Sequence, residues 1–197
     1  MLSKAEDDQR NLNYMKLGRL TLIIVVVFCS IHLGNAQTED VLRVNFLNPA
    51  ISYELATGKN TTLDASLGFG YNYSYPDLAS GSIGGVQYTF AMFADIQGRY
   101  YYNFDRREGK GKRTDHNNGN FIAARMLYTG PGVSQISSFD RFDNNSFAVG
   151  PTWGLQRTYG ERINLLFSIG PIYYFDTVGN GNFFPLNLEI NLGFNLN

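Results

Sequence analysis

The sequence predicts an all-β fold, in which eight strands form an antiparallel up-and-down barrel. Residues Leu63 to Pro76 ("LDASLGFGYNYSYP") alternate strictly between apolar or aromatic side chains and small or polar ones. A period of two indicates a β-strand. No segment of residues 37–197 longer than a turn has helical periodicity, and Gly, Asn, Asp and Ser mark the connections. Only 17% of residues are charged, against 13 tyrosines and 15 phenylalanines, which argues against disorder.

Residues 1–36 have the pattern of a signal-peptide helix. Lys16 and Arg19 precede an apolar run, Leu20 to Leu33, and small residues follow it up to Ala36. The alternative is a membrane anchor, but the run is shorter than the ~18 residues that a spanning helix needs. We therefore expect export with cleavage near Ala36, followed by one barrel domain over residues 37–197.

The exported part carries little net charge and no cysteine. Cys29, the single cysteine, lies in the signal peptide, so no disulfide is expected. Residues 1–36 hold four basic and three acidic side chains, which leaves 12 and 14 of the 16 and 17, a formal charge of −2. Without a basic surface field, nucleic acid is not an expected partner.

The alternation recurs along the whole exported chain. The predicted strands are 40–47, 49–56, 61–75, 86–104, 120–129, 147–157, 162–176 and 184–197. At Asn48-Pro49 the apolar residues change parity, which predicts a turn or a bulge. The alternative is one strand over 41–56, with the eighth strand inside 130–146.

Strand length and aromatic placement favour a membrane as the surroundings of the barrel. Periodicity alone does not tell which face is inside, because a soluble barrel turns its apolar face inward and a membrane barrel turns it outward. Several strands exceed the ~9–11 residues that cross the hydrocarbon. Tyrosine, which prefers membrane interfaces, gathers at strand ends such as Tyr71 to Tyr75 and Tyr100 to Tyr102. We therefore expect a transmembrane β-barrel, with a soluble barrel that binds an apolar ligand as the alternative.

The small and polar face carries sparse charges. An eight-stranded barrel has just enough interior room for side chains, so these charges are predicted to form a network that fills the interior and excludes a wide pore. The residues of this predicted lumen network are Asp64, Asp95, Arg99, Arg125 and Glu189.

Four stretches resemble the small outer-membrane β-barrel proteins of Gram-negative bacteria, the outer membrane protein beta-barrel or porin-like family. They are "VNFLNPAISYELATGKNTTLDASLGFG", "GRYYYNF", "GPTWGLQR" and the closing "LEINLGFNLN", and the resemblance covers about residues 41–197. It implies outer-membrane lipid as surroundings and recognition of the closing strand by the barrel-insertion machinery. Such closing strands usually end on an aromatic residue, whereas this chain ends on Asn197.

With both ends of an even-stranded barrel in the periplasm, residues 105–120 become a periplasmic turn. It holds a basic run: Arg106, Arg107, Lys110, Lys112 and Arg113. For this run, residues 105–113, we expect a flexible, solvated turn; binding of phosphate-bearing headgroups, peptidoglycan or a periplasmic partner is the alternative. Residues 76–85, 130–146 and 177–183 become external loops, where a partner of unknown identity could bind.

No catalytic, cofactor or metal site is predicted. His116 is the only histidine of the exported chain, and the adjacent Asp115 is the one sequence neighbour that could orient its ring for proton transfer. We expect a solvated histidine rather than a general base, and too few ligands for a transition metal. The expected role is structural, interactive or weakly porin-like, and a lipid-modifying enzyme is the less favoured alternative.

Overall fold

The computed structural model describes residues 37–74, 87–133 and 144–197. These residues belong to one compact unit, Ala36–Asn197. The predicted signal peptide, Tyr75 and most of the two long external loops lie outside the described residues. No helix in the described ranges is both long and apolar enough to cross a membrane.

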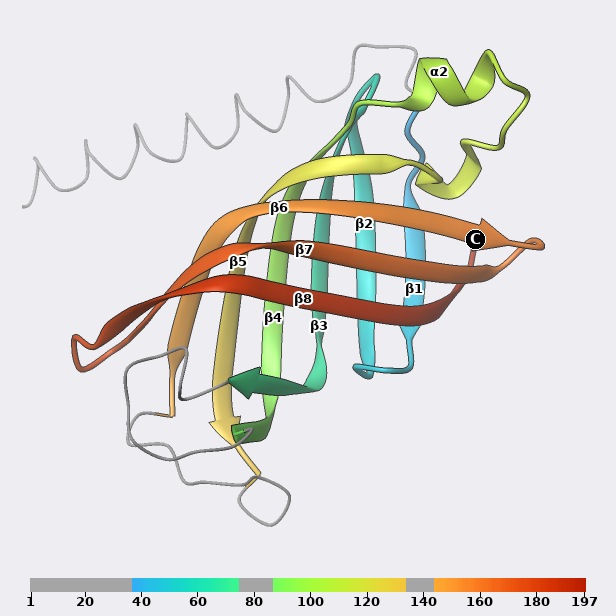
Figure 1. Cartoon of the computed structure of the whole chain (residues 1–197). Helices are drawn as coiled ribbons and strands as arrows, with labels where there is room; N and C mark the ends of the chain where they lie inside the picture. The colour runs from blue at the N-terminus through green and yellow to red at the C-terminus, as the bar shows by residue number, and fades with distance from the viewer. Residues whose placement is uncertain (1–36, 75–86, 134–143) are drawn as a thin grey trace, which may run out of the picture. The chain divides into compact units, whose positions relative to one another are not determined.

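Eight antiparallel strands form a closed barrel in simple sequence order, as Figure 1 shows. The prediction of an all-β, eight-stranded fold is confirmed. The strands are β1 (Val41–Asn45), β2 (Ala50–Gly58), β3 (Thr61–Ser74), β4 (Gln87–Tyr101), β5 (Asn120–Gly132), β6 (Ser146–Tyr159), β7 (Ile163–Asp176) and β8 (Gly181–Asn195).

The parity change at Asn48-Pro49 marks a tight turn between two strands. Residues 46–49 form this turn, and β1 pairs with β2 from Val41↔Glu54 to Asn45↔Ala50. A single strand over 41–56 is therefore wrong. Pro49 has no N–H to donate, so it stands where strand pairing is already interrupted.

The apolar face of the strands points outward and the polar face inward. In β3, Thr62 and Asp64 are each 2% exposed, whereas Leu67 is 60% and Phe69 48% exposed. Alternate residues of a strand lie on opposite sides of the sheet, and most described positions of β3 to β8 follow this division. The structure thus shows which face of the strands is inside, which the periodicity of the sequence did not determine.

Two aromatic residues depart from the predicted outward face. β4 ends at Tyr101, and a short helix, α2 (Phe104–Glu108), begins where the strand was expected to continue, so Phe104 is fully buried. In β8, a bulge shifts the register between the pairs Gly170↔Asn187 and Ile172↔Phe184. The extra residue moves Phe184 to the inward face and leaves Phe183 56% exposed.

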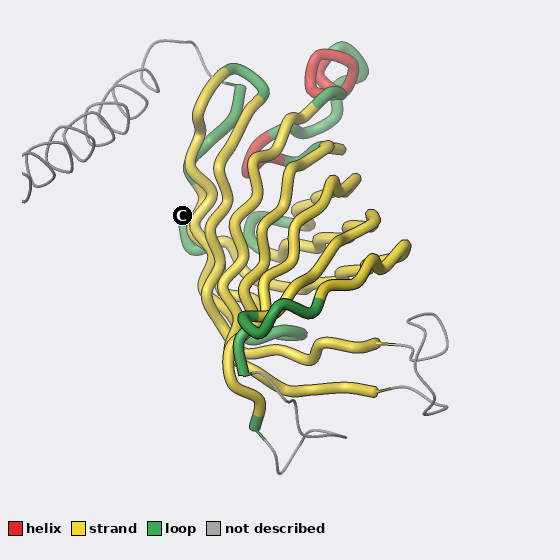
Figure 2. Tube along the Cα trace, turned by 90° about the vertical axis from the view of Figure 1, so that its left-hand side faces the viewer, coloured by secondary structure: helices red, strands yellow, loops and turns green. Residues whose placement is uncertain are grey.

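The long connection between β4 and β5 is structured, and residues 105–113, predicted as a solvated turn, are mostly exposed, whereas residues 114–119 are partly or fully buried. It contains α2 and a 3₁₀ turn, η3 (Asp115–Asn117), which appear in red in Figure 2. His116 and Asn117 have positive φ angles of 53° and 57°, which few non-glycine residues adopt. This reversal turns Asn117 and Asn118 into the end of the barrel, where they are buried.

The two ends of the barrel therefore differ. We call the end that carries residues 102–119 and the turns at 59–60 and 160–162 the closed end. The other end carries the turn at residues 46–49 and the turn at 177–180; we call it the open end, since none of its described residues forms a plug. Both chain segments that flank the barrel lie at the closed end, since Gln37 N donates to Lys59 O and Asn195 N to Arg162 O.

Candidate functional site

Glu54 is the centre of a buried polar network inside the barrel. Its carboxylate lies 2.6 Å from Arg43 Nη2 and 3.5 Å from Arg99 Nη1. It also accepts hydrogen bonds from the hydroxyls of Thr62 and Tyr101, both at 2.7 Å. The Glu54 side chain is fully buried, so its charge is compensated by protein groups and not by bulk water.

Asp64, directly across the strand pair from Glu54, binds the same two arginines. Arg99 Nη2 lies 3.2 Å from its Oδ1 and Arg43 Nη1 3.6 Å from its Oδ2. Two guanidinium groups thus alternate with two carboxylates across β1 to β4. Such mutual pairing is what permits four charges to remain buried together.

A second cluster joins β4, β5 and β8 toward the open end. Arg125 Nη2 lies 2.8 Å from Asp95, and Arg125 Nη1 lies 3.1 Å from Glu189. Gln97 links the two clusters, because it donates to Asp95 at 2.8 Å and accepts from Arg99 Nε at 3.0 Å.

All five residues of the predicted lumen network lie in the interior, and each takes part in an ion pair. The expected contact between Asp95 and Arg99 is indirect, since Gln97 stands between them. Sequence reasoning missed Arg43 and Glu54. Their signal was present: Arg43 alternates with Leu42 and Val44, and Glu54 with its apolar neighbours, so both occupied the polar face.

The network carries more negative than positive charge. It comprises three arginines and the four carboxylates of Glu54, Asp64, Asp95 and Glu189. One carboxylate therefore has no matching cation among the described interior residues. The excess lies where Asp95 and Glu189 share Arg125.

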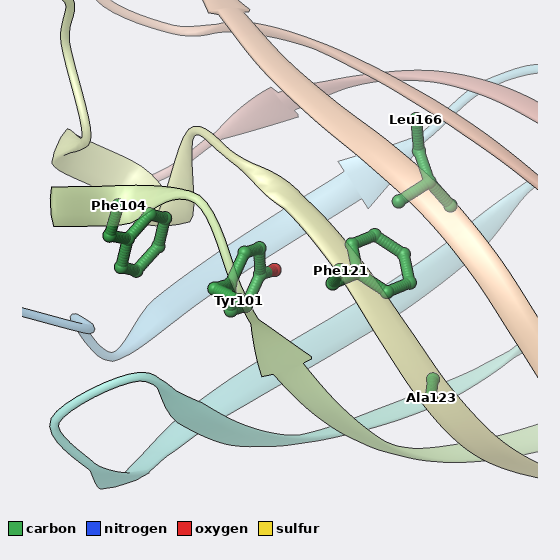
Figure 3. Close-up of a cluster of buried hydrophobic side chains, with 5 residues drawn as sticks. All are labelled: Tyr101, Phe104, Phe121, Ala123 and Leu166. Carbon is green, nitrogen blue, oxygen red and sulfur yellow. The ribbon is translucent and has the colours of Figure 1, made fainter. Parts of the chain in front are cut away.

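Aromatic side chains fill the barrel between the network and the closed end (Figure 3). The Tyr101 and Phe104 rings stack with centroids 4.7 Å apart, and Tyr101 also contacts Phe121 at 5.5 Å. The guanidinium carbon of Arg99 lies 4.9 Å from the centroid of the Phe121 ring, a cation–π distance. Apolar rings thus separate the buried charges from water at this end.

A polar plug completes the closed end. Asn117, fully buried, exchanges two hydrogen bonds of 2.8 Å with the backbone of Glu39. Gln156 Nε2 donates to His116 O at 3.1 Å, and Arg43 Nη2 approaches the same oxygen at 3.4 Å. The chain before β1, the η3 turn and the barrel wall are therefore fastened together.

His116 serves in this fastening. Its Nδ1 lies 3.1 Å from Asp115 Oδ2, and its Nε2 lies 3.1 Å from the main-chain oxygen of Asn197. Both ring nitrogens are thereby engaged within the chain. The side chain is 22% exposed, so the predicted solvated histidine is in fact half-buried.

The five basic residues of the connection do not form one free patch. Arg106, Lys110, Lys112 and Arg113 are exposed, whereas Arg107 is half-buried and donates to Arg113 O at 2.8 Å. Burial lowers the pKa of the Arg107 guanidinium. Arg113 pairs with Asp115 at 2.5 Å, and this hydrogen bond, with that from His116, lowers the pKa of Asp115 to about 2.

A cavity of about 380 Å³ occupies the barrel interior on the open side of the network. Its inner lining includes Ser66, Asp95, Arg125, Glu189 and Asn191. A larger depression, of about 580 Å³, lies elsewhere, over the outer surface of β4 to β7, with an apolar lining that includes Tyr100 and Trp153. We place the candidate site in the inner cavity because charged groups line it, whereas the lining of the outer depression carries none.

Comparison with known proteins adds no assignment. No protein-family model matches this chain, and no curated protein and no solved structure is significantly similar to it. Within the described ranges, no group of three or more His, Cys, Asp or Glu side chains is arranged to hold a metal ion.

Proposed function

We propose that this chain is a small bacterial outer-membrane β-barrel with an occluded interior, whose role is structural or interactive. The single observation that carries the proposal is the inverted distribution of side chains. Ion-paired carboxylates and arginines lie inside, while leucine, isoleucine and phenylalanine side chains cover the outside.

The outward face is costly in water and favourable in lipid. Each large apolar side chain gains about 1.5–3 kcal/mol on removal from water, and soluble monomers rarely expose contiguous apolar patches above a few hundred Å². On β8 alone, Leu186, Leu188, Ile190, Leu192 and Phe194 are each at least 40% exposed on one face. The alternative, a soluble barrel with an apolar ligand inside, would need this face turned inward.

The orientation follows from the two barrel ends. Even-stranded bacterial barrels have both termini in the periplasm, and both flanking segments of this barrel lie at the closed end. We therefore assign the closed end to the periplasm and the open end, with its cavity, to the outside. Bulk transport is disfavoured because Glu54, Gln97, Tyr101, Phe104 and Gln156 are all at most 1% exposed across the interior.

Membrane fractionation is the direct test. The protein should sediment with the outer membrane, and it should migrate differently on a gel before and after boiling, as an intact barrel resists the detergent. A protein that remains soluble without detergent would contradict the proposal. Liposome swelling with the purified barrel should be no faster than in empty liposomes.

A charged residue on the outer face distinguishes lipid from water more sharply. Leu67, in β3, is 60% exposed, so Leu67→Arg would be nearly neutral for a soluble barrel. In a bilayer the same change costs about 2–4 kcal/mol near the midplane. Val178→Arg, in the turn at 177–180 where Val178 is 68% exposed, is the matched control and should leave stability unchanged.

The enzyme alternative has one candidate base, His116. Because both its ring nitrogens contact Asp115 and Asn197, we assign it to fastening the closed end. His116→Ala should leave the lipid profile of the producing cells unchanged. A changed profile from a folded variant would instead favour a lipid-modifying enzyme.

A further inference from the structure

One charged side chain stands on the outward face of the barrel. The outward positions of β6 run from Pro151 through Trp153 and Leu155 to Arg157, which lies near the closed end and is half-buried. Arg157 is the one charged side chain that the described strands place on this face. A charge on the outer face of a membrane barrel is destabilising in proportion to its depth, so its position calls for a partner of opposite charge.

Arg157 still has hydrogen-bond donors to offer. Its Nη1 donates to Gly119 O at 2.8 Å and to Gln156 O at 2.7 Å, and its Nη2 donates to Asn120 Oδ1. A guanidinium group carries five N–H donors, so Nε–H and one Nη2–H have no acceptor among the described residues. Nε also keeps accessible surface, so an incoming oxygen can reach it without displacing a protein partner.

A second arginine adds positive charge at the same place. Arg107 Nη2 donates to Asn118 Oδ1 at 3.1 Å, next in sequence to the residue whose carbonyl Arg157 binds. In the part of the chain that the structure describes, neither arginine forms an ion pair, and Asp115 is already paired with Arg113. Guanidinium groups bind phosphate through charge-assisted hydrogen bonds, so the pair favours a phosphate as the missing anion.

A chain of hydrogen bonds joins Arg157 to the aromatic side chains of the outer face. The Tyr102 hydroxyl accepts from Trp153 Nε1 at 2.8 Å and from Asn120 Nδ2 at 3.4 Å, and Asn120 in turn accepts from Arg157. Tyr102 is 47% exposed, and its hydroxyl hydrogen is donated to no described residue. Tyrosine and tryptophan in such positions are typical of a membrane interface, where lipid phosphates lie.

The apolar depression of about 580 Å³ begins at Trp153 and extends away from this polar line. Tyr100 and Trp153 stand at its closed-end side. Its floor includes Gly98, Ala124 and Pro151, which are lateral neighbours on β4, β5 and β6. Small side chains on adjacent strands leave a hollow with an apolar lining, which suits a hydrocarbon chain.

We propose that this outer surface binds an anionic phospholipid of the periplasmic leaflet. The inference rests on the proposed function, which assigns the closed end to the periplasm. The lipid phosphate accepts hydrogen bonds from Arg157 Nε and from the Tyr102 hydroxyl, and it faces the charge of Arg107. One acyl chain lies in the depression, over Ala124 and Pro151.

Local charge selects the class of head group. Arg107 and Arg157 together carry two positive charges that no described carboxylate compensates by contact. A head group with a phosphate alone, as in phosphatidylglycerol, reduces this excess. The ammonium group of a zwitterionic head such as phosphatidylcholine brings a further positive charge, which the two arginines repel.

The test uses the full barrel in phosphatidylcholine vesicles that contain phosphatidylglycerol, with bromine atoms on the acyl chains of one lipid at a time. Brominated chains quench a tryptophan that they contact. Trp153 is the only tryptophan of the chain and lines the depression, so its emission reports the lipid at this site. Brominated phosphatidylglycerol should reach half of its maximal quenching at an about tenfold lower mole fraction than brominated phosphatidylcholine, which corresponds to 1.4 kcal/mol.

Variants of the two arginines test the head-group contacts. Arg157→Gln should remove the preference for phosphatidylglycerol. Since Arg157 also binds Gly119 O, this variant could fold poorly, and Arg107→Gln provides a second test; it should lower the preference by about threefold, as expected for one partly exposed charge. Arg106→Gln is the matched control, because Arg106 is the exposed neighbour on α2. It removes the same charge and should leave the preference unchanged.

Three results would overturn the inference. They are equal quenching by the two brominated lipids, an equal effect of Arg106→Gln and Arg107→Gln, and relief of quenching by soluble glycerol phosphate, which would mean that the site takes a free anion. A barrel that does not enter vesicles shows no quenching by either lipid. That result contradicts the proposed function instead, so the two failures are distinguishable.

Discussion

Truncation of Glu54 should lower the free energy of unfolding far more than truncation of an exposed turn residue. Glu54→Ala removes the one side chain that contacts Arg43, Arg99, Thr62 and Tyr101 together. Arg43 and Arg99 remain buried, each with Asp64 as its remaining carboxylate partner. The two arginines then share one acid in a region that water does not reach.

The expected cost follows from this geometry. Breaking a buried ion pair by removal of one partner costs about 3–5 kcal/mol, which shifts the unfolding equilibrium by roughly two to three and a half powers of ten. Glu54→Gln should cost less than Glu54→Ala. Its amide can still accept from the Thr62 and Tyr101 hydroxyls, but neutral hydrogen bonds contribute only about 0.5–1.5 kcal/mol each.

The assay is reversible unfolding by guanidinium in lipid vesicles, followed by fluorescence. Trp153 is the only tryptophan; it is 37% exposed on the outer face and donates to Tyr102 OH at 2.8 Å, so its emission should change as the barrel leaves the lipid. Glu161→Ala, at an exposed position of the β6–β7 turn, is the control. If the total fluorescence change is the same in the parent, in Glu54→Ala and in Glu161→Ala, then all three undergo the same unfolding transition and their free energies can be compared.

A small effect would refute the reasoning. If Glu54→Ala lowers the free energy of unfolding by less than about 1 kcal/mol, the cost of one ordinary hydrogen bond, then water or a rearranged neighbour compensates the arginines. The interior would then be open to solvent, and the barrel would not be occluded.

Three further predictions follow from the closed end and the wall. Gly68→Val should prevent stable folding, because a Cβ there would collide with the backbone of the β1–β2 turn. Gly98→Val should fold, because a Cβ there would meet nothing within 4 Å. For both variants, the measure is the amount of protein in the gel band of the folded barrel, which boiling shifts. Since Arg113 depresses the pKa of Asp115 to about 2 from 3.8, the stability that this pair contributes should be present above pH 3.8 and disappear as pH falls to about 2. Carboxyl NMR should record the low midpoint, and Asp115→Asn should abolish this part of the pH dependence. Phe104→Ala should cost about 3–5 kcal/mol and speed amide exchange over residues 115–119, and unchanged exchange would mean that Phe104 does not hold the plug.

Sequence periodicity was sufficient for the strands and for the division of each strand into two faces. Strict alternation in β3 placed Asp64 opposite Leu63 and Leu67, and the structure keeps these residues on opposite faces. The parity change at Asn48-Pro49 likewise located the first turn. These features depend on a period of two and on turn chemistry, both of which are local.

Local patterns failed where distant segments meet. Phe104 continued an alternation in sequence, yet it packs against Tyr101 and Phe121 because α2 turns back over the barrel end. The bulge that turns Phe184 inward and Phe183 outward arises from the register between β7 and β8. This register cannot be predicted from the sequence of either strand alone.

By itself, the sequence determined that the chain forms long, two-faced strands with tight turns, since a strand's period and its turn residues are properties of neighbouring positions. Only the tertiary structure decided that the polar face is inside, that Arg43 and Glu54 belong to the network, and that β1 pairs with only the last part of β8. The physical reason is that closure of the sheet fixes which face is enclosed and which strands are neighbours. That choice depends on all eight strands together and is not present in any one of them.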